Sequence, residues 1–399
     1  MTEKRMKKFL SIAISFWVMI SSNLSVVSMA TEEDININPT DFIEISTVND
    51  LINIENNLDG NYVLKNDIVL SGDEWRSIGG GLEFKGTFDG AGYTISNLYS
   101  ERGRSLFSVL GESAVVKNLT ISGNMVANTY SALLATTSYG TIINCTSSGS
   151  VRQFEYNGRA NSLAGLVLDN YGYMEKCTNK AMLQHAGNGK SKEYSGGWLG
   201  GIAAAQKGTV ISCVNEGEII SDCSESGGIA GYNSSFIIDC VNKGKVTAMY
   251  DRSNTTLSVG GITGVNDGII ARCLNQNSIT SIAVNNAYAT GGICGESIRE
   301  SMIIDCKNIG TVSSSTGNIG GICGQTDINV GYFDENDEFI VNQGNIVISG
   351  CVNDGKIQGE SNPNVYVNVA GIVARAWTLN GMIKVIDCTN NGNIEIIKK

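Results

Sequence analysis

Short apolar runs alternate with polar residues at a recurring interval along residues 125–399. Eight cysteines mark the repeat, and each has an aliphatic residue or Met three positions before it and an aliphatic residue six positions after it. With the cysteine as position 0, the residue at −1 is mostly polar, and Gly is usual at +4. Gly and Asn both tolerate positive φ, so these short runs predict strands joined by tight turns. The eight cysteines are Cys145, Cys177, Cys213, Cys240, Cys273, Cys306, Cys351 and Cys388.

A second phrase, Gly-Gly-Ile followed by two small residues, precedes most of the cysteine phrases and begins at residues 200, 227, 260, 291 and 320. The period varies from 27 to 45 residues, almost entirely because of length changes between position +6 and the next small-residue pair. Such a pattern is typical of stacked coils. We therefore predict an all-β fold, a parallel β-helix of about ten stacked coils with strands about 4.8 Å apart.

The frame continues upstream of the first cysteine, where Leu119 takes the cysteine position, and the pattern appears once more around Leu98. Residues 42–60 differ, because their apolar residues fall near helical spacing after a polar start at Thr47 or Asn49. We expect a short helix there that covers the first coil, followed by a first strand over residues 62–70. A solenoid needs such a cap, since an open edge recruits other chains.

The first 30 residues have the parts of a secretory signal peptide: basic residues at 4–8, an apolar run at 9–20 and a small-residue site at 28–30. A membrane anchor is the alternative, but residues 21–23 interrupt the apolar run short of the roughly 20 residues that span a bilayer. We predict a signal peptide at 1–30, a linker at 31–41, the cap and first coils at 42–124, and the Cys/Asn repeats at 125–399.

Cleavage after Ala30 removes four basic residues and Glu3, which leaves 24 Lys and Arg against 38 Asp and Glu. An acidic surface repels phosphate backbones and anionic lipids, so nucleic acid and membrane partners are not expected. No later stretch is long and apolar enough to insert in a membrane, and the last residues show no wall-sorting motif. We expect a secreted or cell-surface protein that is non-covalently attached if it is held at the surface.

Several segments read GNYVLKNDIVLSGDEWRSIGG, FKGTFDGAGYTISNL, SLFSVLGESAVVKNLTISG and the GGI-x-G phrases. In them the chain resembles bacterial surface proteins with GLUG-type repeats, and the same elements occur in the N-terminal region of the immunoglobulin A1 metallopeptidases. The resemblance covers about residues 42–399 and implies a right-handed parallel β-helix on an exported bacterial protein. It does not imply the peptidase, because those enzymes carry a separate zinc domain with an HExxH helix, and this chain has only His185.

The chain has 11 cysteines, and in an exported protein such a number is compatible with a disulfide framework. Stacking in register brings neighbouring ladder cysteines within reach, but their parallel Cα–Cβ directions suit the required dihedral near 90° poorly. We therefore expect buried free thiols that pack as small apolar groups. Zinc binding is not expected, because CxxC and a second His are missing, and no metal or cofactor is predicted.

Seven of the eight repeats carry Asn at position +2. Stacked amides can hydrogen-bond from coil to coil at a turn, and a residue repeated seven times is not a catalytic group. We predict a structural ladder of Asn179, Asn215, Asn242, Asn275, Asn308, Asn353 and Asn390.

A polysaccharide-cleaving β-helix enzyme needs paired carboxylates with a basic partner, or carboxylates that hold Ca²⁺. The best acidic cluster, at residues 334–338, lacks the spacing of a defined Ca²⁺ loop and fits a solvated loop. His185 lies in a polar insertion without an evident partner. We therefore expect no catalytic residues and no enzyme activity.

The insertions should emerge along one edge of the stack, and they carry aromatic residues that suit sugar or protein contacts. The same side chains also suit packing between coils. The candidate ligand-binding residues are Tyr156, Tyr194, Trp198, Tyr250, Tyr288 and Tyr366.

The sequence favours an exported, non-catalytic β-helical protein that acts in surface adhesion or in recognition of an extracellular glycan or a host or cell-surface protein. A polysaccharide-cleaving enzyme and a stalk for a separate catalytic partner remain the alternatives. The final segment, residues 394–399, is apolar apart from Glu395, Lys398 and Lys399. We expect it to form an open edge that supports end-to-end self-association.

Overall fold

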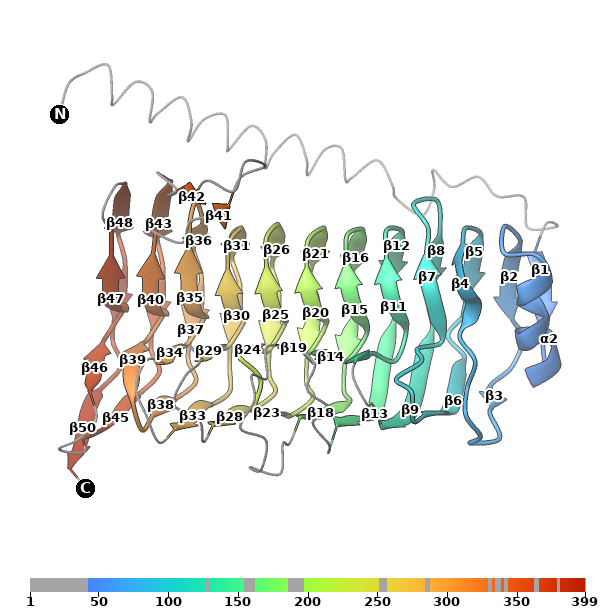
Figure 1. Cartoon of the computed structure of the whole chain (residues 1–399), viewed down its shortest axis with the longest axis horizontal. Helices are drawn as coiled ribbons and strands as arrows, with labels where there is room; N and C mark the ends of the chain where they lie inside the picture. Colours follow the sequence, from blue (N-terminus) through green and yellow to red (C-terminus); the bar gives the residue numbers. More distant parts are fainter. Residues whose placement is uncertain are drawn as a thin grey trace, which may run out of the picture. The chain divides into compact units, whose positions relative to one another are not determined.

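The computed structural model describes residues 42–126, 130–153, 162–185, 197–250, 257–283, 288–328, 332–333, 339–340, 344–361, 366–378 and 381–398. The predicted signal peptide and linker lie outside these residues. From Ile43 onward the chain forms one unit, and this unit is a stack of coils whose strands follow one another in sequence order along the stack (Figure 1).

The coils build four parallel sheets, which we number I to IV in the order in which the chain crosses them, and the coils before β10 have no strand in sheet III. Sheet I has 12 strands: β1 (Phe42–Ile45), β2 (Asn61–Leu64), β5 (Thr87–Asp89), β8 (Val115–Lys117), β12 (Thr141–Ile143), β16 (Tyr173–Glu175), β21 (Thr209–Ile211), β26 (Phe236–Ile238), β31 (Ile269–Ala271), β36 (Met302–Ile304), β43 (Asn345–Ser349) and β48 (Met382–Ile386).

Sheet II follows the cysteine and is split into two short strands in most coils. Its strands are β3 (Ile68–Val69), β6 (Thr94–Ser100), β9 (Thr120–Val126), β13 (Thr146–Gln153), β17 (Thr178–Asn179), β18 (Met182–His185), β22 (Val214–Asn215), β23 (Ile219–Ser221), β27 (Val241–Asn242), β28 (Val246–Tyr250), β32 (Leu274–Asn275), β33 (Ile279–Ala283), β37 (Lys307–Asn308), β38 (Val312–Ser314), β44 (Val352–Asn353), β45 (Ile357–Ser361), β49 (Thr389–Asn390) and β50 (Ile394–Lys398).

Sheets III and IV flank the Gly-Gly phrase. Sheet III contains β10 (Tyr130–Ser131), β14 (Ser162–Ala164), β19 (Trp198–Gly200), β24 (Glu225–Gly227), β29 (Leu257–Gly260), β34 (Tyr288–Gly291), β39 (Gly317–Gly320) and β46 (Val367–Ala370). Sheet IV contains β4 (Ile78–Phe84), β7 (Phe107–Leu110), β11 (Ala135–Ser138), β15 (Val167–Asn170), β20 (Ala203–Gln206), β25 (Ala230–Asn233), β30 (Thr263–Asn266), β35 (Cys294–Ile298), β40 (Cys323–Asp327) and β47 (Val373–Trp377). The predicted parallel β-helix is confirmed, and a short antiparallel hairpin of β41 (Tyr332–Phe333) and β42 (Phe339–Ile340) is added between β40 and β43.

The N-terminal helix is also confirmed, as α2 (Val48–Ile52), which continues into the 3₁₀ helix η2 (Asn53–Asn56). Thr47 caps it: its side chain accepts from the Asp50 backbone N–H, and the Asp50 carboxylate accepts from the Thr47 N–H. Leu51 and Ile54 are fully buried beneath the first coil.

Two boundaries differ from the prediction. A strand, β1, precedes the helix, and the expected strand over 62–70 is two strands, β2 and β3, separated by a corner. The polar residues 65–67 form that corner, where the Lys65 N–H bonds to the Ile45 carbonyl and the chain turns from sheet I to sheet II.

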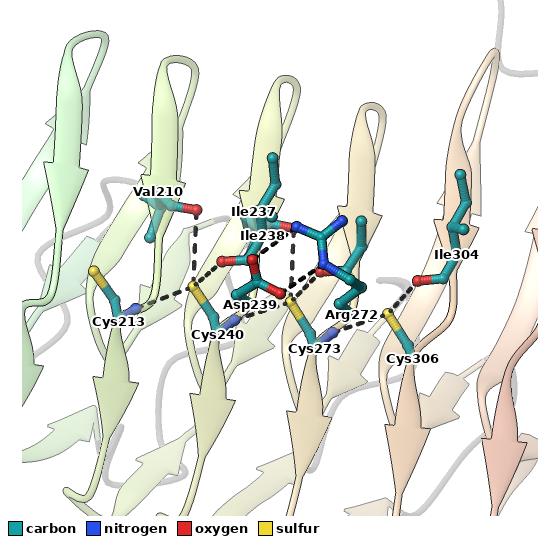
Figure 2. A network of polar contacts seen from close by, with 11 residues as sticks. Val210, Cys213, Ile237, Ile238, Asp239, Cys240, Arg272, Cys273, Ile304 and Cys306 are labelled. Atoms are coloured by element: carbon teal, nitrogen blue, oxygen red, sulfur yellow. Dashed lines mark hydrogen bonds and ion pairs between the residues drawn. The ribbon is translucent and has the colours of Figure 1, made fainter. Parts of the chain in front are cut away.

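The ladder cysteines are buried in the core as predicted, except the half-buried Cys388, and none of the 11 cysteines forms a disulfide. Figure 2 shows the contacts between cysteines of consecutive coils: the Cys213 N–H donates to Cys240 Sγ over 3.4 Å, and the Cys240 N–H donates to Cys273 Sγ over 3.4 Å. Burial raises the pKa of the Cys213 and Cys306 thiols. These two thiols are therefore neutral, and they fill the core.

The residue before each ladder cysteine takes a left-handed conformation, with φ of 51° to 54° at the non-glycine positions from Asn144 to Asp387. This single residue turns the chain between sheets I and II. The polar character of position −1 follows from exposure at this corner, where Arg272 and Asp239 form a two-pronged ion pair with both contacts at 2.7 Å (Figure 2).

The asparagine ladder is continuous from Asn179 to Asn390, with side-chain amide contacts of 2.7–2.9 Å between consecutive coils. Each ladder amide also donates to the backbone carbonyl two residues further along its own coil, as Asn242 does to Gly244 over 2.9 Å. Ser147 starts the ladder by donating to Asn179 over 2.8 Å. Because every member bonds within and between coils, the ladder fixes the turn and the stacking together.

The last coil leaves apolar side chains in solvent: Ile394 is 47% exposed, Ile396 57% and Ile397 39%. Among the described residues there is no helix of the length and apolarity that crossing a bilayer requires.

Candidate functional site

The structure brings together only part of the predicted aromatic set. Tyr156 and Tyr194 lie outside the described residues. Tyr250 ends β28 and Tyr288 begins β34. Trp198 is half-buried at the start of β19, and Tyr366 is exposed just before β46.

Trp198 and Tyr366 lie near the two ends of a polar strip where sheets III and IV meet, which we call the seam. In sheet III the register aligns Trp198, Glu225, Ser258, Ala289, Asn318 and Asn368 in successive coils. In sheet IV it aligns Tyr232, Val265, Glu296, Gln325 and Arg375.

Glycine residues permit sheets III and IV to approach each other closely at the seam. A Cβ added at Gly264 would lie 2.5 Å from the Ser226 backbone nitrogen, and one at Gly295 would lie 2.4 Å from the Val259 nitrogen. These glycines end the Gly-Gly-Ile phrases, so the phrase sets the spacing of the sheets. The following residue then projects beside the neighbouring sheet III strand.

The N-terminal part of the seam is aromatic. The rings of Trp198 and Tyr232 stack with centroids 5.6 Å apart and an interplanar angle of 27°. The Tyr232 hydroxyl donates to Asp267 over 2.9 Å, and Arg299 contacts both residues. The Tyr232 ring is therefore held in one orientation by the ion pair between Asp267 and Arg299.

Two glutamates lie beside this aromatic pair. Burial and the charge of Glu296 raise the pKa of Glu225 to about 7, and a hydrogen bond from Trp198 opposes the shift. Glu225 Oε2 is buried and has no hydrogen-bond partner. Burial also raises the pKa of Glu296, although bonds from Gln325 at 2.6 Å and Ser258 at 3.2 Å oppose the shift.

A chain of amides continues the seam toward the C-terminal coils. Asn318 donates to Gln325 over 2.9 Å, and Asn368 donates to Asn318 over 3.0 Å and contacts the Tyr366 hydroxyl. At the same end the Arg375 guanidinium lies 4.3 Å from the centre of the Trp377 ring, which is 47% exposed. The seam thus offers rings at both ends and polar groups between them.

Sequence reasoning missed Glu225, Tyr232, Glu296 and Gln325. For the last three the signal was present, because the residue directly after the Gly-Gly-Ile phrase changes from Tyr232 to Val265, Glu296 and Gln325 while the Gly-Gly-Ile core is constant. A variable position inside a repetitive frame marks a surface that packing does not dictate.

The expectation that His185 has no partner was wrong. His185 is buried at the end of β18, and its Nδ1 contacts the Asp222 carboxylate from the next coil. Cys223 lies in the same cluster. Burial lowers the pKa of His185, but Cys223 and Asp222 together raise it to about 10.

A separate aromatic surface lies nearer the N-terminal end of the stack. The rings of Tyr139 and Tyr171 stack with centroids 5.0 Å apart, and Lys207 Nζ lies 4.6 Å from the Tyr171 centre. Tyr139 also borders a pocket of about 520 Å³ with Glu83 and Glu112.

Comparison with protein-family models gives no match. Halomucin of Haloquadratum walsbyi is 35% identical over 125 residues, which cover 27% of this chain and 1% of that protein. The chain thus spans a very small part of that relative.

Among solved structures, a protein of Bacteroides ovatus provisionally assigned as an immunoglobulin A1 protease matches with a TM-score of 0.31 and 18% identity, over 90% of this chain and 78% of that one. An IgA1 protease matches with a TM-score of 0.37 and 13% identity, over 86% of this chain and 21% of that one. Both names agree with the resemblance seen in the sequence, and at these scores the matches support no inference about activity.

Proposed function

We propose that this chain is an exported, non-catalytic β-helical protein that recognises an extracellular glycan along the seam. Export rests on the N-terminal sequence, and recognition rests on the seam. The partner is a carbohydrate chain on a polymer or on a cell-surface protein, and nucleic acid and membranes are not partners.

The observation that carries the proposal is the stacked Trp198–Tyr232 pair beside the unpartnered Oε2 of Glu225. A fixed aromatic face with a polar rim suits the apolar face of a sugar ring, and a carboxylate at that rim suits a sugar hydroxyl. The amides that follow are spaced by one coil each, about 4.8 Å. A row of this kind fits an extended chain ligand that runs along the stack.

The test is binding of residues 31–399 to an array of soluble polysaccharides and glycans, followed by titration of each hit. We expect Trp198→Ala and Glu225→Gln to weaken binding of the same glycan at least tenfold, with an unchanged circular dichroism spectrum. Tyr93→Ala, an exposed tyrosine outside the seam, is the matched control and should bind normally. Equal binding by all three variants would exclude the seam.

The two glutamates support a second candidate, a polysaccharide-cleaving enzyme. A carboxyl group with a pKa near 7 is suited to donate a proton at neutral pH, and Glu225 is such a group beside a second carboxylate. Incubation with the bound polysaccharide distinguishes the two: new reducing ends or unsaturated products that disappear in Glu225→Gln and Glu296→Gln would establish the enzyme. Binding without product supports recognition alone.

A further inference from the structure

His185, Asp222 and Cys223 form a cluster that the proposed recognition does not use. The ligand-type atoms of the three side chains all lie within 4.8 Å of one another. His185 and Cys223 are buried, with 3% and 0% of their surfaces exposed, whereas the Asp222 side chain is 16% exposed. The cluster is therefore enclosed in the stack and open to solvent at the aspartate.

The fold assembles this cluster from two coils. The register pairs Leu183 with Ile219 and Gln184 with Ile220, so His185 comes opposite Ser221, and residues 222 and 223 follow in the turn. The Asp222 N–H bonds to the His185 carbonyl over 3.2 Å, and the Cys223 N–H bonds to Ser221 Oγ over 2.9 Å. Backbone and side-chain bonds thus fix all three groups before any ligand arrives.

The chemistry of the donors is selective. One imidazole nitrogen, one carboxylate oxygen and one thiol sulfur make a set that suits Zn²⁺ and similar transition ions, whereas Ca²⁺ and Mg²⁺ require mainly oxygen. The other ring nitrogen of His185, Nε2, is buried without a hydrogen-bond partner. Asp222 already contacts Nδ1, so an ion that takes both side chains as ligands binds on the Nδ1 side of the ring, within reach of the Cys223 thiol.

We propose that His185, Asp222 and Cys223 bind one divalent transition-metal ion of the zinc class, which links two neighbouring coils. Three protein ligands leave one position of a tetrahedral ion for water or for a fourth donor. Gln153, buried and aligned with His185 in the β13–β18 register, is the nearest side chain of the preceding coil in that row. The ion ties β18 to the turn before β24 and so stabilises the part of the stack that presents Trp198 and Glu225.

The test uses residues 31–399, stripped with a chelator, exchanged into metal-free buffer and titrated with Co²⁺ and then Zn²⁺. We expect one ion per chain, a near-ultraviolet charge-transfer band of a cobalt–thiolate bond, and full displacement by Zn²⁺ but not by Mg²⁺. Zinc should also raise the thermal midpoint, since an ion that binds only the folded state stabilises it.

Variants assign the ligands. Cys223→Ser should abolish the thiolate band, and His185→Gln should weaken zinc binding by at least about 100-fold. Cys388→Ser, at a ladder thiol remote in sequence and half-buried, is the matched control and should keep both. Asp222→Asn changes only the exposed member, so it tests the site even where a buried substitution disturbs folding. A thiolate band that survives in Cys223→Ser, binding far below one ion per chain, or unchanged affinity in Asp222→Asn would overturn the proposal.

Discussion

A few side chains with unusual surroundings determine how this protein responds to its environment. The ladder thiols and ladder amides are satisfied by contacts along the stack, and all but Cys388 and Asn390 are buried. Glu225 is different, because its Oε2 is buried without a hydrogen-bond partner. A protonated carboxyl is the cheaper form in such a place, so this residue couples stability to pH.

The first prediction follows from this coupling. The folded state holds the Glu225 proton up to a pKa of about 7, against 4.5 for the ordinary group. Its contribution to stability is therefore complete below pH 4.5 and is lost as the pH rises toward 7. Glu225→Gln removes the loss, so at pH 8 the variant should be more stable by on the order of 1–3 kcal/mol, and near pH 4 the two proteins should agree. Urea midpoints at pH 4, 6 and 8 measure this, and parallel curves would contradict it.

The second prediction concerns the asparagine ladder. Asn242→Ala removes the amide that donates to Asn275 and to the Gly244 carbonyl and that accepts from Asn215. Because several buried polar groups lose partners at once, we expect a loss of about 2–4 kcal/mol. Asn391→Ala, whose amide is exposed and bonds only to Asp354 among the described residues, should cost less than about 0.5 kcal/mol. Urea unfolding of both variants gives the comparison. Equal small losses in the free energy of unfolding would mean that the ladder amides contribute little to stability.

At the scale of elements, the Gly-Gly-Ile phrase of one coil packs directly against the Cys-x-Asn phrase. The second glycine of each Gly-Gly pair lies directly over the ladder asparagine: a Cβ at Gly228 would be 2.3 Å from Asn242 Cγ, and one at Gly261 would be 2.5 Å from Asn275 Cγ. The turn between sheets III and IV therefore closes onto the turn within sheet II. This explains why Gly-Gly-Ile and Cys-x-Asn recur together in the sequence.

Gly261→Ala tests that contact and is the third prediction. The added methyl group would also meet the Gly292 carbonyl oxygen of the next coil at 2.1 Å, so neither neighbour can yield without moving a stacked backbone. We expect a loss of about 1–3 kcal/mol, as for overpacking in general. Gly92→Ala is the control, because its φ of +84° is strained but no atom lies within 4 Å of the new Cβ. A larger loss at Gly92 than at Gly261 would show that backbone strain, not crowding, governs these glycines.

The N-terminal helix and the two ladders could be predicted from the sequence, for physical reasons. The helix α2 was found because capping and apolar spacing are local signals, and the ladders were found because inward positions repeat in every coil. The split of 62–70 into β2 and β3 was missed, because a corner of polar residues looks like the exposed face of a strand. The seam and the His185 cluster were missed because they join residues of different coils, and register alone decides which of them meet.

On the scale of the whole molecule, the stack has few specific long-range contacts beyond neighbouring coils, so stability is close to a sum over coils and interfaces. The two ends of the described stack then differ. The first is covered by α2 and η2, whereas β50 shows Ile394, Ile396 and Ile397 to solvent.

The fourth prediction follows for a protein made of residues 31–399. An unpaired strand with exposed isoleucines recruits a second strand, and lysines at the edge oppose this only weakly. We expect reversible end-to-end association that grows with concentration in light scattering. Ile394→Lys and Ile396→Lys together should abolish it without loss of fold. A monomer at all concentrations would show that the two terminal lysines suffice.

The fifth prediction uses the coil as a unit. Phe236 and Ile269 occupy the same place in successive coils, so deleting residues 236–268 joins Ser235 to Ile269 and removes one complete coil in phase. Each remaining side chain keeps its inward or outward position, and the product should fold, with a modest fall in the thermal midpoint and a stack shorter by about 4.8 Å.

Deleting 236–269 removes one residue more and joins Ser235 to Ile270. Ile270 would then stand where Phe236 faced outward, because a one-residue slip reverses every side chain in a strand. Cys273, the left-handed Arg272 and Asn275 would each lie one residue out of register with the ladder positions of the coils on both sides. Circular dichroism and thermal melts of the two deletions measure the difference. Equal stability of both products would mean that the turns absorb the slip and that the repeat does not fix the register.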